Sequence, residues 1–363
     1  MGMTRSTEMT GDAQRIYAVL HRPGHFASRS AFPPLVEILG ATPVYYDIGW
    51  EKLQRRSWRL GHALRAFGNR YYGSEWNALI PFYDEGRLAR QIKDPDGCLV
   101  HFLYGEFATP RSRGLFRGRT GRLVGTFHAS VRKQPSVLGR STAFRNYDWI
   151  SVVSATQVPF FIEHGFPVER IRVLPLGVDT DYFAPPDSAP PVHDGPLRGL
   201  LVGTTERDHE FMASVMKRMP PGVLELSVRT VPEQESNYRG VSGVNLLPRL
   251  SDDELVRAYG SAELLVMPLL DCTANDAILE AMACGTPVVT NRVGGIPEYV
   301  SGEAGYLLDE KRVDLWVDQL AALARKRDEL RAMRPAVRRW AERFSWRLIA
   351  SQYRQFYRDA LAT

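Results

Sequence analysis

The chain has few cysteines and no long apolar run. Its three cysteines, Cys98, Cys272 and Cys284, are an odd and widely spaced set that makes neither a disulfide framework nor a zinc site. No run approaches the roughly 20 apolar residues that span a bilayer, and residues 1–14 lack the apolar core of a signal peptide. These absences argue against a secreted disulfide-rich protein and an integral membrane protein. We expect a cytoplasmic protein with reduced thiols.

The sequence also lacks histidine, cysteine and carboxylate residues at metal-ligand spacing, so we expect no metal. Nucleic acid is not an expected partner, because no recognised binding module accompanies the arginines. Residues 1–175 hold 24 Lys/Arg against 14 Asp/Glu (net +10), which leaves 22 against 27 (net −5) for the remainder of a chain of net charge +5. A basic first half favours an anionic partner, such as a lipid surface or a phosphorylated acceptor, with a solvated basic surface as the alternative.

Strand and helix patterns alternate along the whole chain, which predicts mostly parallel sheets covered on both faces. We expect first-half strands at residues 15–20, 43–48, 98–104, 123–127, 149–154 and 171–175. Further strands are expected at residues 199–202, 223–229, 244–247, 264–269 and 287–291. The proline-rich residues 183–198 have no hydrophobic period and predict a linker. The expected fold is therefore α/β, with doubly wound Rossmann-like domains at 1–182 and 199–343 facing across a cleft.

The stretch 264–298 combines a buried strand, a polar loop and a helix. Asn275 is the expected N-cap of that helix, Gly285 its end, and the glycine pair 294–295 opens a further helix. A strand–loop–helix unit places ligands at the carboxyl end of its strand, where backbone N–H groups and the helix dipole favour an anion. Glu280, in the second turn, is near enough to this mouth to accept hydrogen bonds from vicinal hydroxyls.

Several segments resemble the retaining glycosyltransferases of family 4, which have the GT-B fold and include phosphatidylinositol mannosyltransferases. The matching segments, in chain order, are V-G-T-F-H at 124–128 followed by A-S, V-V-S at 152–154, L-G-V-D at 176–179 with Phe183 and Pro185, L-E-A-M-A-C-G-T-P-V-V at 279–289, and Gly294-Gly295 with Glu298. The resemblance covers roughly residues 124–300 and the tail. It implies that the aromatic helix of residues 344–363 crosses back onto the first domain, with an ordinary amphipathic closing helix as the alternative.

The resemblance implies a nucleotide-diphosphate sugar as donor and no other cofactor. Glu280 matches the glutamate that holds the ribose, and charge-assisted hydrogen bonds of this kind contribute about 1.5–3 kcal/mol each. The first glutamate of the family motif falls on Cys272. Thr204 and His209 stand at or near the usual phosphate-binding arginine and lysine, and Arg207 is another cation for that role. The expected donor-binding residues are Gly24, Arg207, His209, Thr273, Ala274, Asn275, Asp276, Ala277 and Glu280.

His128 is the expected catalytic residue on the acceptor side. It ends a strand at the cleft, and an imidazole can hydrogen-bond the sugar or pass a proton near neutral pH. His101 is a second candidate, with a structural strand histidine as the alternative. Tyr104 and Glu106 remain open as acceptor contacts.

Two basic stretches bear on the acceptor. Residues 50–68 form an amphipathic pattern that suits either a helix packed on the first domain, which we favour, or a helix on an anionic membrane surface. Residues 111–145 add a run of arginines on the expected acceptor side. Together they predict an anionic or membrane-borne acceptor and peripheral contact with the inner membrane face.

Three functions fit these observations. The first is a retaining, metal-independent glycosyltransferase that moves a sugar from a nucleotide-diphosphate donor to a hydroxyl acceptor, preferably a glycolipid or polysaccharide intermediate and next a small-molecule scaffold. The second is a non-catalytic nucleotide-sugar-binding subunit, because Cys272, Thr204 and Leu103 occupy usually polar or charged positions. A nucleotide-sugar epimerase is the third, and the transferase motifs disfavour it.

Overall fold

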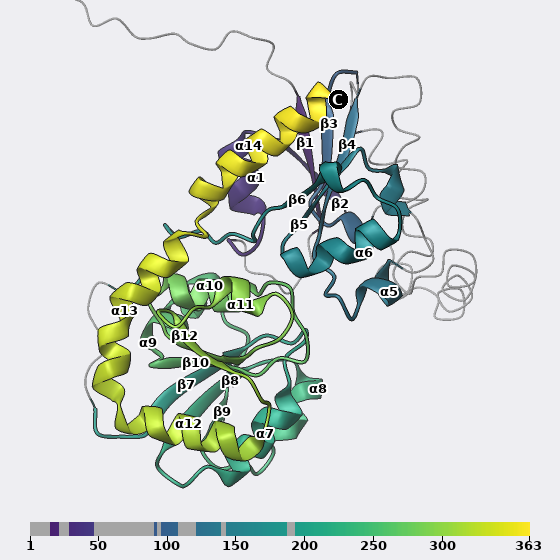
Figure 1. Cartoon of the computed structure of the whole chain (residues 1–363). Coiled ribbons are helices and arrows are strands. Elements are labelled where there is room, and N and C mark those ends of the chain that lie inside the picture. The colour runs from purple at the N-terminus through teal and green to yellow at the C-terminus, as the bar shows by residue number, and fades with distance from the viewer. Residues whose placement is uncertain are drawn as a thin grey trace, which may run out of the picture.

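The computed structural model describes residues 15–21, 29–46, 91–92, 96–107, 121–138, 143–186 and 193–363. Gly24, the amphipathic stretch 50–68 and much of the basic run 111–145 lie outside these residues. The described chain forms two α/β domains joined near residues 174–186 (Figure 1). No helix among the described residues is long and apolar enough to cross a membrane.

The first domain contains a parallel sheet of six strands in the order β2-β1-β3-β4-β5-β6. Its strands are β1 (Ile16–His21), β2 (Thr42–Tyr46), β3 (Leu99–Phe102), β4 (Arg122–Phe127), β5 (Trp149–Val152) and β6 (Ile171–Val173). Its described helices are α1 (Pro33–Leu39), α5 (Gln134–Val137) and α6 (Val158–Glu163), with 3₁₀ turns η1 (Gly105–Phe107), η3 (Ala143–Asn146), η4 (Ala155–Gln157) and η5 (Val168–Arg170). Strand order reverses between β1 and β3, which is where such sheets open a crevice for ligands.

The second domain has a parallel sheet in the order β12-β11-β10-β7-β8-β9. Its strands are β7 (Leu197–Val202), β8 (Leu224–Arg229), β9 (Val244–Leu246), β10 (Leu264–Met267), β11 (Val288–Asn291) and β12 (Gly305–Leu308). Its helices are α7 (His209–Arg218), α8 (Pro232–Glu235), α9 (Asp252–Ser261), α10 (Asp276–Ala283), α11 (Ile296–Tyr299), α12 (Val313–Arg325) and α13 (Arg327–Glu342), with the 3₁₀ turn η6 (Ser236–Tyr238). Here strand order reverses between β10 and β7.

Local sequence explains several element boundaries. α9 begins at a reciprocal capping box, in which the Ser251 side chain accepts from the Glu254 backbone and the Glu254 side chain from the Ser251 backbone. β10 is an uninterrupted apolar run that is buried throughout, as central parallel strands are. β12 was not expected from the sequence. It is an edge strand that is buried only at its first residue, so its apolar pattern is short and weak.

The terminal helix α14 (Trp346–Ala362) leaves the second domain and lies along the first, beside α1 (Figure 1). Just before α14, the two segments that pass between the domains are hydrogen-bonded to each other through their backbones. The Val178 N–H donates to the Phe344 carbonyl at 2.9 Å, and the Trp346 N–H donates to the Val178 carbonyl at 3.1 Å. The buried residues of α14 include Ile349, Tyr353, Phe356 and Tyr357. The predicted return of this helix to the first domain is confirmed.

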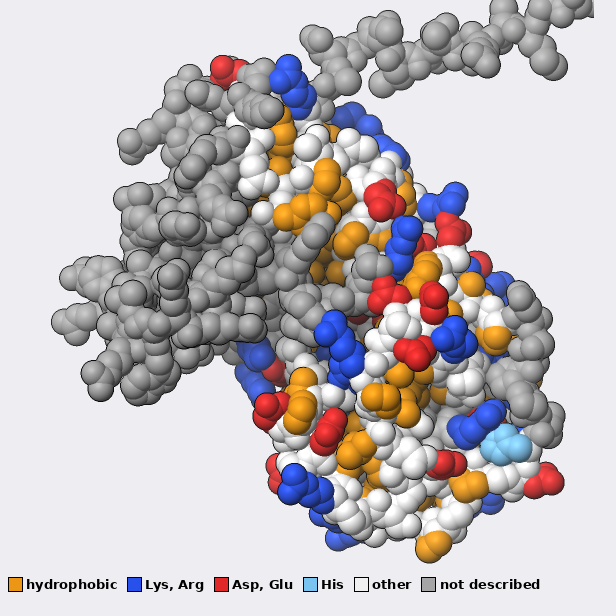
Figure 2. Space-filling model, turned by 180° about the vertical axis from the view of Figure 1, so that it is seen from behind, with side chains coloured by type: hydrophobic (Ala, Val, Ile, Leu, Met, Phe, Trp, Pro, Cys, Tyr) orange, Lys and Arg blue, Asp and Glu red, His pale blue; other side chains and the backbone are white. Residues whose placement is uncertain are grey.

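Basic and acidic side chains alternate over the described surface seen in Figure 2, and neither sign gathers into one patch there. The basic stretches that predict an anionic partner fall largely outside the described residues. That partner therefore stays a prediction.

Candidate active site

The loop that ends β10 and the start of α10 form the mouth of the second domain. The Asn275 side chain accepts from the Ile278 N–H at 3.2 Å and caps α10, as predicted. Gly294 and Gly295 let the following loop pack tightly against this mouth. A Cβ at Gly295 would lie 2.2 Å from the Thr273 carbonyl oxygen, so a larger residue would push the loops apart.

Glu280 is buried on α10 and faces the first domain. Its Oε1 accepts from the Ser30 hydroxyl at 2.5 Å, and its Oε2 accepts from the Tyr259 hydroxyl at 2.8 Å. Ser30 belongs to the segment just before α1, so this carboxylate joins the two domains. Burial, followed by repulsion from Asp276, raises the pKa of Glu280 to about 7. The geometry shows that both carboxylate oxygens can accept from hydroxyl groups at the same time.

Arg207 brings a permanent positive charge to this mouth. Its Nη2 donates to the Asn275 Oδ1 at 3.1 Å, and its Nη1 and Nε donate to the carbonyls of Thr205 and Val202 at 2.6 and 3.3 Å. Burial raises the pKa of the nearby Asp276, and the charges of Arg207 and His128 oppose that rise. Arg207 is therefore placed to offset a negative charge at the N-terminus of α10.

His209 lies at the start of α7 and is buried. Its Nδ1 is 2.9 Å from the Tyr238 hydroxyl, and its Nε2 is 3.0 Å from the Gly203 carbonyl and 3.1 Å from the Thr230 hydroxyl. Burial is the main cause that lowers its pKa. Because its ring is fully engaged within its own domain, the structure favours a structural role over the phosphate contact expected from the resemblance.

Cys272 is a buried thiol at the position of the missing motif glutamate. Its Sγ donates to the Ala274 carbonyl at 2.9 Å. Burial raises the pKa of this thiol to about 11, so it stays neutral at physiological pH. Ala274 and the buried Ala277 line the same turn, but Cys272 supplies neither an anionic ligand nor a base.

His128 follows β4 and faces the mouth of α10 from the first domain. Its backbone N–H and that of Ala129 donate to the Glu106 Oε1, the latter at 2.7 Å. The Glu106 Oε2 lies 3.6 Å from the His128 Nδ1, and the ring of Tyr104 packs 4.9 Å from the imidazole. Both ring nitrogens of His128 are buried without a hydrogen-bond partner. Unsatisfied buried polar atoms are rare in native structures, so the ring nitrogens of His128 call for an explanation.

Glu106 holds the His128 loop in place. Burial by itself would raise its pKa, but hydrogen bonds from His128 and the charge of that residue bring the pKa below its ordinary value. Glu106 is thus an anchored carboxylate. Its contacts give it a positioning role beside His128.

His101 lies on β3, under α14. Its Nδ1 is 2.8 Å from the Tyr357 hydroxyl, and its Nε2 is 2.7 Å from the Thr126 hydroxyl. Burial, followed by the charge of His128, lowers the pKa of His101 to about 3. The alternative of a satisfied strand histidine therefore fits the structure better than an acceptor contact.

The two domains touch at several points where strands end. The Thr273 hydroxyl donates to the His128 carbonyl at 2.6 Å, and the Ser154 hydroxyl to the motif carboxylate Glu298 at 2.7 Å. Lys133 forms an ion pair with Glu206 across the same gap. The sequence did not indicate Ser30, Tyr259 or the Lys133–Glu206 pair. No local pattern marks residues whose partners lie in another domain.

Among the residues that the structure covers, no group of three or more His, Cys, Asp or Glu is arranged to hold a metal ion. The carboxyl-end loops of the two sheets face each other through the contacts above. Two such domains, together with a terminal helix that returns to the first, define the GT-B class of fold.

Both domains of the chain match models of glycosyltransferase families. A family model described as "Glycosyltransferase Family 4" matches residues 44–182, and one described as "Glycosyl transferases group 1" matches residues 202–326. The two matches fall on the two domains in turn.

Two relatives illustrate the sequence similarity. An MMP α-(1→4)-mannosyltransferase of Mycolicibacterium hassiacum is 33% identical over 231 residues, covering 59% of this chain and 54% of the relative. A D-inositol 3-phosphate glycosyltransferase of Segniliparus rotundus is 30% identical over 219 residues, which cover 53% of this chain and 48% of the relative. The chain spans about half the length of these relatives.

Solved structures agree on the architecture. Sucrose-phosphate synthase of Thermosynechococcus elongatus has a TM-score of 0.70 at 17% identity, covering 96% of this chain and 100% of its own. HepE of Anabaena, solved in complex with UDP, has a TM-score of 0.67 at 13% identity, and the match covers 95% of this chain and 100% of HepE. At these identities the similarity establishes the fold.

Proposed function

We propose that this protein is a retaining glycosyltransferase that moves a sugar from a nucleotide-diphosphate donor to a hydroxyl acceptor. The observation that carries the proposal is the Glu280 carboxylate, which accepts one hydroxyl from each of two residues at the mouth of α10. A ribose offers two neighbouring hydroxyls to such a carboxylate. In this proposal its first hydroxyl replaces that of Ser30.

The donor diphosphate would lie at the N-terminus of α10. The N–H groups of residues 273–277 and the helix dipole favour an anion there, and Arg207 adds a full positive charge. Asp276 opposes that anion only while it is ionised, and burial raises its pKa. The proposal needs no metal, because Arg207, the helix dipole and the N–H groups together supply the electrostatic support.

The acceptor would approach from the side of His128. In the transfer, the bond between the anomeric carbon and the diphosphate oxygen breaks, and a bond to the acceptor oxygen forms. The hydroxyl proton passes to the leaving phosphate, as the family resemblance implies, while His128 holds the sugar or the acceptor. Glu106 positions the His128 loop through its hydrogen bonds to the backbone.

The acceptor class follows from the basic first half and from the relatives. A relative named as a D-inositol 3-phosphate glycosyltransferase supports a phosphorylated small-molecule acceptor. The glycolipid or polysaccharide intermediate, which we prefer, rests on the basic first half alone. The same charge favours contact with an anionic membrane surface, which for a cytoplasmic protein is the inner membrane face. HepE, solved with UDP, supports a uridine nucleotide as the first donor to test.

Calorimetry with UDP-, GDP- and ADP-sugars tests the donor site on the wild type, Glu280→Ala and the exposed control Asp309→Ala. We expect one nucleotide family to bind, Glu280→Ala to lose at least about tenfold in affinity, as loss of a charge-assisted hydrogen bond implies, and the control to match the wild type. Lack of binding across the panel would overturn the donor site. Donor binding without sugar transfer to any glycolipid, polysaccharide or small-molecule acceptor would instead favour the non-catalytic subunit.

A further inference from the structure

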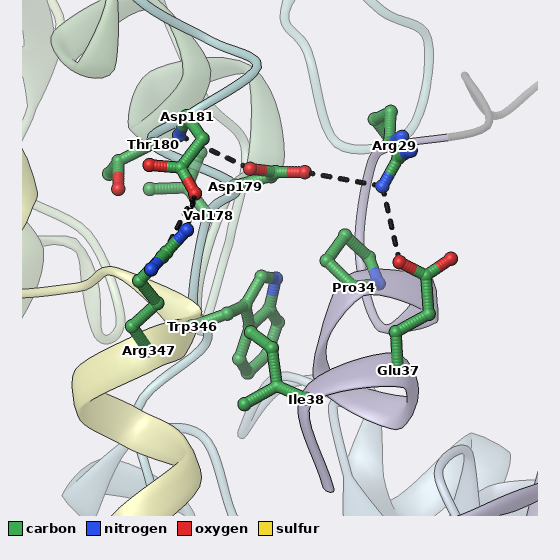
Figure 3. A pocket seen from close by; sticks show the side chains of 10 residues that line it. All are labelled: Arg29, Pro34, Glu37, Ile38, Val178, Asp179, Thr180, Asp181, Trp346 and Arg347. Carbon is green, nitrogen blue, oxygen red and sulfur yellow. Dashed lines mark hydrogen bonds and ion pairs between the residues drawn. The ribbon is translucent and has the colours of Figure 1, made fainter. Parts of the chain in front are cut away.

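A pocket lies at the junction of the two domains, outside the candidate active site (Figure 3). Its volume is about 360 Å³, within the range of roughly 300–1,000 Å³ that small-molecule sites occupy. α1, the junction residues 178–181 and the first turn of α14 form its walls. The lining residues are Arg29, Pro34, Glu37, Ile38, Val178, Asp179, Thr180, Asp181, Trp346 and Arg347.

Trp346 forms the floor of this junction pocket. Its side chain is 1% exposed, and its indole Nε1 has no hydrogen-bond partner. In Figure 3 this nitrogen lies on the edge of the ring that faces the space between Asp179 and Pro34. A buried donor without an acceptor is costly, so native structures rarely leave one unexplained. An acceptor atom on a ligand would satisfy it.

The Trp346 ring cannot readily turn to find a partner elsewhere. The ring of Phe32 packs 5.3 Å away on one side. On another side is Gly177, where an added Cβ would come within 2.5 Å of the indole. The orientation of the unsatisfied N–H is therefore built into the junction.

The walls carry charges that are already paired. Arg29 Nη1 is 3.3 Å from Glu37 Oε2 and 3.7 Å from Asp179 Oδ2, while Arg347 Nε donates to Asp181 Oδ2 at 2.9 Å. Asp179 is fixed further, because its Oδ1 accepts from the backbone N–H groups of residues 181 and 182, each at 3.2 Å. Three carboxylates against two guanidinium groups leave the wall slightly negative, with carboxylate oxygens still able to accept.

This combination discriminates between classes of ligand. An anion would meet a wall with an excess of carboxylates, and an ammonium group would bring no acceptor for the indole N–H. A neutral ligand with several hydroxyls brings both donors and acceptors. Each hydroxyl can donate to a carboxylate oxygen, and its oxygen can accept from Trp346 or a guanidinium. Pro34, Ile38 and Val178 would contact the C–H face of a ring. We propose that the junction pocket binds a neutral saccharide unit.

The site is independent of the proposed donor site. Its lining residues do not include Glu280, Arg207 or His128, although Arg29 directly precedes Ser30. A saccharide in the junction pocket would contact α1, the crossing segment and α14 together. It would thus brace the elements that join the domains.

NMR of the indole N–H groups tests the proposal. The chain has seven tryptophans, and Trp346→Phe identifies the Trp346 signal in ¹⁵N-labelled protein. The probes are methyl α-D-mannoside, methyl α-D-glucoside and their α-linked disaccharides, with inorganic phosphate and choline as the anionic and cationic controls. We expect at least one saccharide to shift the Trp346 signal in a saturable manner, and phosphate and choline to leave it in place.

Exposed variants separate binding from folding. Glu37→Gln and Asp181→Asn lie at the rim, with side chains 68% and 64% exposed. Each should weaken saccharide binding by about fivefold, because a neutral amide oxygen is a weaker acceptor than a carboxylate oxygen. Asp309→Asn, in an exposed ion pair far along the chain, should not change it. No Trp346 shift with any saccharide, an equal shift with phosphate, or unchanged affinity in both rim variants would overturn the proposal. Calorimetry of donor binding on the same samples reports separately on the Glu280 site.

Discussion

The hydroxyl of Ser30 in the first domain donates a 2.5 Å hydrogen bond to the carboxylate of Glu280 in the second. One side chain therefore links the domains through the atom that the proposed donor would need. Donor binding and this interdomain contact compete for the same oxygen. The competition leads to the first prediction.

Replacing Ser30 by alanine should tighten donor binding, because the ribose no longer has to displace a hydroxyl. The expected gain is about threefold to tenfold, corresponding to one hydrogen bond of roughly 1 kcal/mol. Calorimetry with the donor that binds the wild type measures it, and Ser351→Ala, an exposed serine of α14, serves as control. Weaker binding by Ser30→Ala would show that Ser30 assists the donor instead of competing with it.

The raised pKa of Glu280 gives a pH-dependent stability. Its pKa rises from an ordinary 4.5 to about 7 on folding, so its favourable contribution is fully present below pH 4.5 and is lost as the pH rises through 7. Glu280→Gln should therefore be more stable than the wild type at pH 8, by about 1–3 kcal/mol, and similar to it near pH 4. Urea unfolding at both pH values measures the difference. An equal difference at both would contradict the burial of an ionisable carboxyl.

The His101–Tyr357 hydrogen bond should stabilise the docking of α14. Tyr357→Phe leaves a buried ring nitrogen without a partner, which costs about 1–3 kcal/mol of unfolding free energy. Tyr182→Phe removes a hydroxyl that donates to Asp253 on the surface and should cost less than about 1 kcal/mol. Denaturant unfolding of the two variants compares them. Equal losses would argue that the buried network does not hold the helix.

His128→Ala should lower the rate of sugar transfer while donor affinity stays near the wild-type value. Loss of an imidazole that holds the sugar or the acceptor in place lowers kcat by about 10². Steady-state kinetics with the acceptor in excess measures kcat, and His164→Ala, whose ring stacks on Phe160 outside the cleft, is the control. Glu106→Gln should give a smaller loss, because Glu106 acts through His128. An unchanged kcat in His128→Ala would remove it from the site.

Two glycines test how tightly the domain junction is packed. A Cβ at Gly177 would lie 2.5 Å from the Trp346 ring, whereas one at Gly302 would meet nothing within 4 Å. Gly177→Ala should cost about 1–3 kcal/mol through overpacking, and Gly302→Ala should change stability by less than about 0.5 kcal/mol. Thermal unfolding of both variants makes the comparison. A neutral Gly177→Ala would mean that the indole can move aside.

Local patterns in the sequence were enough to predict the alternating α/β fold and the Asn275 cap, because apolar periodicity, capping chemistry and glycine positions are determined by neighbouring residues. The return of the terminal helix was predicted from the family resemblance. The burial of His209 and the contact of Ser30 with Glu280 were not predictable in the same way. Their partners come from distant segments, and a sequence pattern does not specify which side chain a fold brings next to another. The residues of the candidate active site stay predictions until substrates are bound.

The paired crossings at Val178 and Ser345 limit how the two domains can move. The chain passes between the domains twice, and both passages are bonded to each other through the backbone. If the domains open, we expect them to rotate about an axis near this pair. α5 lies on the opposite side of the molecule from α13 (Figure 1), so the Lys133–Glu206 contact would separate widely while the contact of Tyr299 with Val153 and Leu176 scarcely moves. A fluorescent pair placed across the outer gap would report that rotation at its greatest amplitude.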